Sequence, residues 1–388
     1  MDFKDTELFK VYLILFFKNV AGSIFHLFSA VYLFVNGFSF LEIGGFYIFM
    51  SLTMIGSVFL MGTGKLRLKT KPLINVGLMF LVLTMVMMYF LPSNPQILLV
   101  TSIMFGLQTC FFWVPVHATF AYESKGRIMG KEAGIYVVMQ KTGNIIGPLL
   151  ASAVIIFWGF EFIYMIAMIF ALCAMVSVTS LKVSFKIPKI NFRRAFPRFD
   201  KGVSIALTGE AINGRLLTVA LPLFMFLIIG SVAPVGWLVS LAILFGFITI
   251  FFVGVLSDKK KKFEKKIFKI GIGASSLSWI LRIFAFNFWT LLFLEYFDNI
   301  ASSIRTVPFH AYYYNKARNS HHVLEYTMVR EIIIHTAIVL FMLLMVLMLY
   351  MFPIQYVFIL GSIGVLLEIF MIKKPQKLFF HKPLHRHK

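Results

Sequence analysis

Long, continuous apolar runs dominate the pattern of hydrophobic and polar positions along the chain. A window of about 20 residues, the length that an α-helix needs to cross a bilayer core, finds twelve such runs. They cover residues 9–35, 41–62, 72–91, 97–121, 132–156, 162–181, 204–229, 234–256, 268–285, 289–314, 325–350 and 354–372. The runs lack the period-two alternation of a transmembrane barrel. The pattern therefore predicts an all-α, polytopic membrane protein with twelve transmembrane helices.

Composition and charge placement agree with this prediction and orient the chain. Of the 388 residues, 60% are hydrophobic and 14% are charged, whereas about 25% are charged in a typical soluble protein. Lys and Arg exceed Asp and Glu by 37 to 16, and the excess of +21 lies in the connections after every second run and at both ends. The other connections contain no Lys or Arg. The positive-inside rule then predicts an integral protein of the plasma or inner membrane with both termini cytoplasmic, and no nucleic-acid partner.

An internal repeat divides the chain near its midpoint. Val114-Pro115-Val116-His117-Ala118 recurs 193 positions later as Val307-Pro308-Phe309-His310-Ala311. Glycines repeat at an offset of 192, as Gly22 with Gly214, Gly44 with Gly236 and Gly62 with Gly254. These offsets predict two parallel six-helix repeats, an architecture found in transporters. The predicted organisation is an N-terminal half at 1–181, a basic cytoplasmic linker at 182–202, a C-terminal half at 203–373 and a basic tail at 374–388.

Two short motifs resemble those of the major facilitator superfamily. Gly254-Val-Leu-Ser-Asp258-Lys259 is similar to the family's loop motif, and Gly143-Asn-Ile-Ile-Gly147-Pro148 is similar to its antiporter motif. The first-half copy of the loop motif departs from the pattern, with Leu66 where an acid is expected, and Ala151-Ser152 replaces a glycine pair. The resemblance implies the major facilitator fold, alternating access around a central cavity, and gating roles for Gly143, Gly147, Pro148, Gly254, Asp258 and Lys259.

Ionisable residues inside the runs are the candidate site residues, because each costs about 2.5–3.5 kcal/mol at mid-bilayer and by default faces the bundle interior. The predicted substrate-binding residues are Lys18, Asn19, His26, Asn213, Arg215 and Arg305. The predicted proton-coupling or charge-pair residues are Glu210, Glu295, Asp298, Glu331, His335, Arg330 and Lys141. Arg282 and Glu368 lie near run ends, where snorkelling to water is expected. A competing interpretation treats the interior charges as gating ion pairs, such as Lys18 with Glu210.

The predicted function is secondary active transport of a small organic solute, anionic or zwitterionic, by alternating access with proton coupling. The partners would be that solute, protons and the bilayer, and the protein would act as a monomer. Drug/proton antiport of amphiphilic compounds is an alternative, and a non-transporting receptor or a polytopic membrane enzyme is an alternative of another class. No Ser/His/Asp cluster, metal-ligand set or GxxxxGK[ST] loop occurs in the sequence. We therefore expect no catalytic residues, no metal and no cofactor.

Overall fold

The structure is a computed structural model that describes residues 7–64, 69–123, 129–187, 189–257, 261–320 and 322–372. Within these ranges the chain is helical, and its only strand-like pairing is an isolated bridge between Lys69 and Lys186. The tail at 374–388 and the motif residues Asp258 and Lys259 lie outside the described residues.

The first six long helices overlie the first six predicted runs. They are α1 (Glu7–Val35), α2 (Phe40–Gly62), α3 (Thr70–Phe90), α4 (Leu98–Glu123), α5 (Met129–Phe157) and α6 (Ile163–Thr179). Ser39 starts α2 with a capping box, in which its hydroxyl accepts a hydrogen bond from the Glu42 amide while the Glu42 carboxylate accepts one from the Ser39 amide.

The later helices overlie the remaining runs, with one interruption. They are α8 (Lys201–Arg215), α9 (Leu221–Ile229), α10 (Val232–Ser257), α11 (Lys261–Leu281), α12 (Phe288–Asn319), α13 (Val323–Met351) and α14 (Phe358–Leu367). A π-helical turn at Leu216–Ala220 joins α8 to α9. Pro222 follows this turn directly, and because proline has no amide hydrogen it leaves the carbonyl of Thr218 without its usual helical donor.

Eight segments of the described chain are long and apolar enough to cross a membrane. They are Glu7–Val35, Phe40–Gly62, Thr70–Phe90, Pro95–Glu123, Lys201–Ile229, Lys265–Phe284, Val323–Met351 and Ile354–Ile372. Two shorter apolar helices, Ile163–Thr179 and Val232–Leu244, accompany them. The chain is therefore an integral membrane protein.

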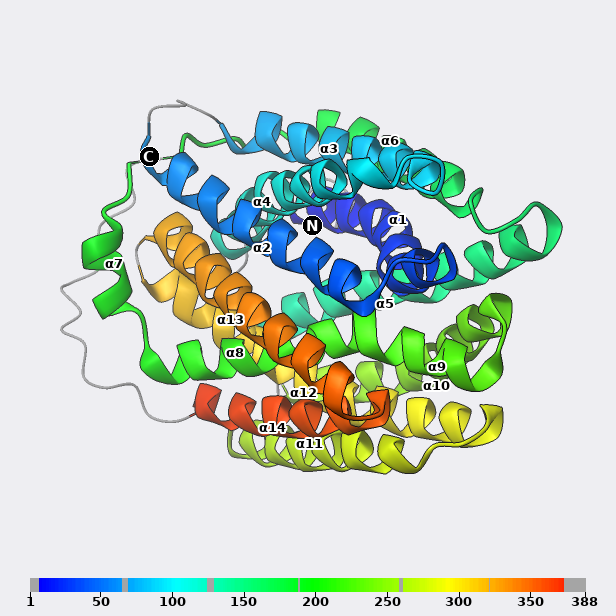
Figure 1. Ribbon diagram of the computed structural model, residues 1–388. Coiled ribbons are helices and arrows are strands. Elements are labelled where there is room, and N and C mark those ends of the chain that lie inside the picture. Colours follow the sequence, from blue (N-terminus) through cyan, green and yellow to red (C-terminus); the bar gives the residue numbers. More distant parts are fainter. Residues whose placement is uncertain are drawn as a thin grey trace.

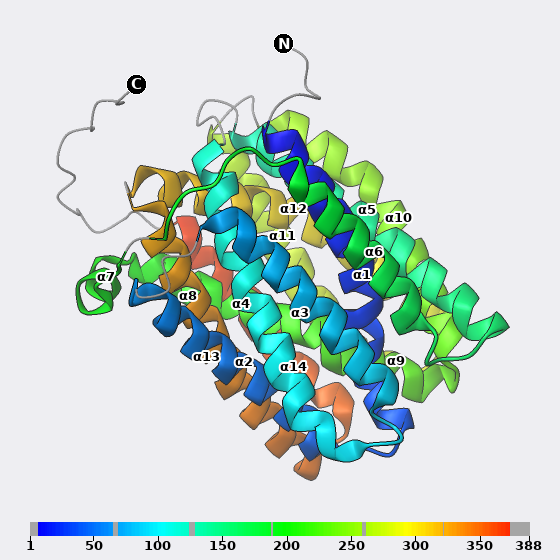
Figure 2. The ribbon, with the colours of Figure 1, turned by 90° about the horizontal axis from the view of Figure 1, so that it is seen from above.

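The helices form one bundle in which early and late segments of the chain lie side by side (Figures 1 and 2). α5 packs against α10, and α2 packs against α13. Small residues allow the close approach of α5 and α10. The Ser152 hydroxyl donates to the Ala233 carbonyl at 2.9 Å, and the Ser240 hydroxyl donates to the Ile145 carbonyl at 2.9 Å. Such packing and hydrogen bonding hold helices together where burial of apolar surface gives no advantage over lipid.

The predicted linker contains a short helix, α7 (Phe192–Arg198), at one end of the bundle (Figure 1). The chain that leads into this helix is hydrogen-bonded to the neighbouring segments of the bundle. The Ile190 amide donates to the Gly62 carbonyl at 2.8 Å, and the Thr70 amide donates to the Phe185 carbonyl at 3.0 Å. The linker is therefore a folded part of this end of the protein.

Candidate functional site

Three buried arginines form ion pairs with five carboxylates in the interior of the described bundle. Arg282 binds Glu295 and Asp298, Arg330 binds Glu210 and Glu331, and Arg305 binds Glu368. Lys18, Lys141 and Arg215, the other interior cations, have no carboxylate within ion-pair distance among the described residues. The interior therefore has two kinds of cation, paired arginines and cations without an acid.

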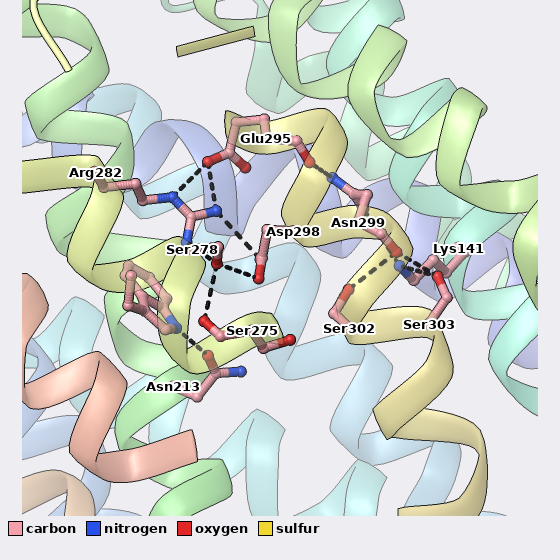
Figure 3. A network of polar contacts seen from close by, with 11 residues as sticks. Lys141, Asn213, Ser275, Ser278, Arg282, Glu295, Asp298, Asn299, Ser302 and Ser303 are labelled. Atoms are coloured by element: carbon pink, nitrogen blue, oxygen red, sulfur yellow. Dashed lines mark hydrogen bonds and ion pairs between the residues drawn. The ribbon is translucent and has the colours of Figure 1, made fainter. Parts of the chain in front are cut away.

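The first network joins α11 to α12 and is fully enclosed (Figure 3). Arg282 has no exposed surface; its Nη2 lies 2.5 Å from Glu295 Oε1 and 3.2 Å from Asp298 Oδ2. The Ser278 hydroxyl donates to Asp298 Oδ1 at 2.7 Å, and the guanidinium stacks over the Trp279 ring at 4.2 Å. The prediction that Arg282 snorkels to water is wrong, because two carboxylates within one helical turn of α12 satisfy it inside the bundle.

Lys141 of α5 reaches α12 from another side, close to this network (Figure 3). Its ammonium donates to Asn299 Oδ1 and to the Ser303 hydroxyl, both at 3.3 Å. Asn299 in turn donates to the Glu295 carbonyl at 2.9 Å. Lys141 was predicted to be a proton-coupling or charge-pair residue, and in the structure its ammonium contacts neutral oxygens of α12, a helix far away in the sequence.

Arg305 and Glu368 form a second buried pair, between α12 and the last helical turn of the described chain. Glu368 has no exposed surface, so the prediction that it snorkels is also wrong. Arg305 also closes against Gly271 of α11, where an added Cβ would lie 2.8 Å from the Arg305 amide nitrogen. The structure thus places Arg305 at the contact of α12 with α11, where it is paired with Glu368.

The third network lies where the early and late helices meet. Arg330 Nη1 binds Glu331, and Arg330 Nη2 lies 3.5 Å from Glu210 Oε2. Two histidine rings flank Glu331, with Nε2 of His117 and of His335 each 3.9 Å from a carboxylate oxygen. The suggested pairing of Lys18 with Glu210 is wrong, because Arg330 on the neighbouring α13 is the partner of Glu210.

Lys18 and His26 lie beside Gly22 on α1, and Arg215 is the last residue of α8; we call these three residues the central basic cluster. The Lys18 ammonium lies 4.3 Å from the centre of the Trp113 ring, and the Arg215 guanidinium lies 5.4 Å from the centre of the Tyr47 ring. Both cations act electrostatically on His26, whose Nδ1 has no hydrogen-bond partner in the described chain. Aromatic faces attract cations, yet they do not neutralise them. The cluster is therefore a positively charged spot inside the bundle.

The two predicted asparagines lie outside this cluster. Asn213 accepts a hydrogen bond from Trp279 Nε1 at 2.9 Å, which fixes α8 to α11. Asn19 lies at the contact of α1 with α5, where an added Cβ on Gly143 would be 2.8 Å from Asn19 Cβ. Of the six residues predicted to bind substrate, the structure brings together Lys18, His26 and Arg215.

The glycine–proline motif of α5 makes close contacts with two helices. An added Cβ on Gly147 would lie 2.7 Å from the Val20 carbonyl of α1. The Ser23 hydroxyl donates to the Gly143 carbonyl at 3.0 Å, and the Pro148 carbonyl faces Gly236 of α10. Gly254, from the loop motif, lies within α10. The α5 motif is thus the place where α1, α5 and α10 approach most closely through small residues.

A cluster of aromatic rings crosses the bundle near the repeated Val-Pro-x-His-Ala segments, and sequence reasoning missed it. Tyr314 forms a 2.7 Å hydrogen bond with His117 Nδ1 and stacks on His310. Phe120 and Tyr136 pack on Tyr314, with ring centres 4.5 and 5.7 Å away. The available signal was the recurrence of a histidine in the two Val-Pro-x-His-Ala segments, as His117 and His310. The cluster joins α4 and α5 to α12.

In the described part of the chain, no three His, Cys, Asp or Glu side chains are grouped as metal ligands would be. Cys110 and Cys173 both lie in this part and are free thiols.

Comparison with known proteins supports a transporter fold. No protein-family model matches the sequence, and no curated protein matches it. Solved structures do resemble it. The human organic anion transporter MFSD10 (TETRAN) is 13% identical with a TM-score of 0.67, over 96% of this chain and 100% of that one. A bacterial homologue of the iron transporter ferroportin, in an outward-facing state, is 12% identical with a TM-score of 0.68, over 95% and 98%.

The proton:xylose symporter XylE of the major facilitator superfamily is 12% identical with a TM-score of 0.66, over 94% of this chain and 95% of that one. The three neighbours are membrane transporters that each match almost the whole length of the chain. The protein therefore has the major facilitator superfamily fold.

Proposed function

We propose that the protein is a secondary transporter that moves a small organic anion across the membrane by alternating access. The observation that carries this proposal is the central basic cluster. Lys18 and Arg215 are cations inside the bundle with aromatic faces beside them and no carboxylate within ion-pair distance among the described residues. An anion supplied by the substrate would complete the pairing that the protein gives its other arginines.

In this proposal the chain forms twelve transmembrane helices in two parallel repeats, with both termini cytoplasmic. The contacts of α5 with α10 and of α2 with α13 would be the surfaces on which the halves rock. The cluster around Tyr314 would close one end of the path, because it joins α4 and α5 of one half to α12 of the other.

Proton coupling would act through Glu210, Arg330 and Glu331. Glu331 shares one arginine with Glu210 and lies between two histidine rings, so it has more than one partner available when its protonation changes. Carboxylates in such surroundings are the usual proton carriers of transporters. Protonation of Glu331 would release Arg330 toward Glu210 and so alter the contact of α13 with α8.

The antiporter alternative rests on the glycine–proline motif of α5. Close packing of Gly143 and Gly147 on α1 gives this motif a structural role that requires no drug substrate. One of the structural neighbours is an organic anion transporter, but at 13% sequence identity it supports a shared fold and says nothing about the substrate of this chain. The charge argument therefore stands on the residues of this chain.

The test is transport by the purified protein in proteoliposomes, with and without a pH gradient. We expect uptake of members of a panel of mono- and dicarboxylates and organic phosphates, and no uptake of cationic amphiphiles. The variant Lys316→Gln removes a cation outside the central basic cluster, one that forms a partly exposed 3.0 Å ion pair with Asp200, and it should transport as the wild type does. Movement of cationic amphiphiles alone would support the antiporter, and movement of neither class would overturn the proposal.

A further inference from the structure

The connection between α6 and α8 carries an excess of positive charge that its own acid does not neutralise. Residues 182–201 include seven Lys and Arg and a single acid, Asp200. Asp200 is already engaged, since it caps α8 by accepting from the Val203 amide at 3.1 Å and pairs with Lys316 at 3.0 Å. Among the residues that the structure describes, the cations of this segment form no ion pair, so an external anion could bind them.

α7 presents these cations on one side because its other side is anchored. The Phe192 ring lies against Gly62 and 4.9 Å from the Phe59 ring, and Ala195 is buried. Just beyond the helix, the Phe199 ring stacks on Tyr326 at 4.4 Å. The opposite side of the helix carries the exposed residues Arg193, Arg194, Pro197 and Arg198, and the Phe196 ring, also exposed, lies at the border of the anchored side, 6.3 Å from the Phe192 ring.

A hollow adjoins this exposed side. Its volume is about 530 Å³, and it is lined by Lys189, Ile190, Asn191, Phe192 and Arg193. The hollow therefore combines two cationic side chains and an amide with the edge of an aromatic ring. Guanidinium groups bind phosphate oxygens through paired hydrogen bonds, which makes a phosphate a suitable occupant.

The position of α7 identifies where the phosphate would come from. Figures 1 and 2 place the helix outside the bundle, at the end where α2 finishes and α8 begins, and the Ile190 amide bonds to the last residue of α2. Because α2 is long and apolar enough to cross a membrane, we infer that its last residue lies near the membrane surface. Basic side chains together with an exposed aromatic ring at this depth are typical of segments that lie on an anionic membrane surface.

We propose that the exposed face of α7 binds the headgroups of anionic phospholipids. Arg193, Arg194 and Arg198 contact the phosphates, and Phe196 reaches the boundary with the acyl chains. This surface lies on the linker and shares no residue with the central basic cluster, so lipid binding here is independent of the proposed transport function.

The test is native mass spectrometry of the full chain in detergent, titrated with phosphatidylglycerol or with phosphatidylcholine. We expect the wild-type protein to retain phosphatidylglycerol in preference to phosphatidylcholine. The variant R193Q/R194Q/R198Q should weaken phosphatidylglycerol binding about ten-fold or more, because each basic residue at a membrane surface adds severalfold to the affinity for anionic lipid. The matched control K265Q/K266Q/K269Q removes three exposed cations from α11 and should retain the wild-type affinity.

Three results would overturn the proposal. The arginine variant could bind phosphatidylglycerol as well as wild type does, or the α11 control could lose as much binding, which would indicate a response to net charge alone. Complete displacement of the lipid by millimolar inorganic phosphate would assign the hollow to a free anion instead. A second variant, Phe196→Ser, keeps all charges and should lower lipid retention while leaving the binding of inorganic phosphate unchanged.

Discussion

The ammonium of Lys18 lies 4.3 Å from the centre of the Trp113 ring. Among the described residues, Lys18 has this cation–π contact and no carboxylate within ion-pair distance. The three buried arginines are treated differently, because each lies against at least one carboxylate. A cation–π contact contributes about 2 kcal/mol when desolvated, which offsets only part of the cost of a buried charge. The structure thus keeps a site in which an anion would be stabilised.

Arg282 should be indispensable for stability. Replacing it by Gln leaves Glu295 and Asp298 buried without their cation, which typically costs about 3–5 kcal/mol. We expect a large drop in the midpoint of thermal unfolding, measured by tryptophan fluorescence in detergent. The control Lys316→Gln breaks a partly exposed pair and should lower stability by about 1 kcal/mol or less. Equal midpoints for the two variants would refute the structural role of Arg282.

Two glycines of α5 should respond oppositely to the same substitution. Gly147→Ala places a methyl group 2.7 Å from the Val20 carbonyl, so α5 must move away from α1. Gly134→Ala meets no atom within 4 Å and gains about 1 kcal/mol of helix propensity. Thermal unfolding of both variants checks this, with Gly147→Ala lowered and Gly134→Ala unchanged or raised. Destabilisation by Gly134→Ala and tolerance at Gly147 would contradict the packing described.

The sequence predicted the helices well because membrane-spanning runs are continuous and long. Each of the twelve runs lies on helical segments of the structure, although the run at 204–229 is interrupted by a π-helical turn. The folding of the linker was not predicted. Its fixed position depends on Phe192 reaching Gly62, a contact between segments more than a hundred residues apart that local periodicity does not encode.

The hydrogen bond between Tyr314 and His117 should hold α12 against α4. Tyr314→Phe keeps the ring packing and removes the 2.7 Å bond, so this end of the bundle should open more readily. Hydrogen–deuterium exchange of the peptides around His117 and His310 should become faster. Tyr350→Phe is the control, because this side chain is 71% exposed. Unchanged exchange in Tyr314→Phe would show that the bond does not help to close the bundle.

Glu331 should be required for proton coupling. Glu331→Gln keeps the size of the side chain and removes the proton-binding group that lies between Arg330 and the two histidines. We expect loss of uphill accumulation driven by a pH gradient, with exchange of substrate at equal concentrations retained. The control Glu368→Gln removes another buried acid, the partner of Arg305. The folded fraction of this variant should still accumulate substrate against its gradient when driven by a pH gradient. Retained accumulation in Glu331→Gln would exclude Glu331 as the coupling group.

The charged residues of the interior were identified from sequence, but most of their partners were not. Glu295 and Asp298 were identified as interior acids, but their common partner was not: it is Arg282, in the short 3-10 turn that follows α11. The pairing of Glu210 with Arg330 likewise depends on how α8 packs on α13. The spacing of residues along one helix shows which side chains share a face of that helix. An ion pair between two helices also depends on the rotation of each helix about its axis and on its position along the membrane normal, which the sequence does not specify.

The central basic cluster is tested most directly by equilibrium binding of a radiolabelled organic anion, chosen from the transport panel, to purified protein. We expect Lys18→Gln and Arg215→Gln each to weaken binding at least ten-fold, because each removes a charge that the anion would contact, while Lys316→Gln retains wild-type affinity. Arg215→Lys should recover part of the loss. Wild-type affinity in both Lys18→Gln and Arg215→Gln would contradict the account of this cluster as the anion site.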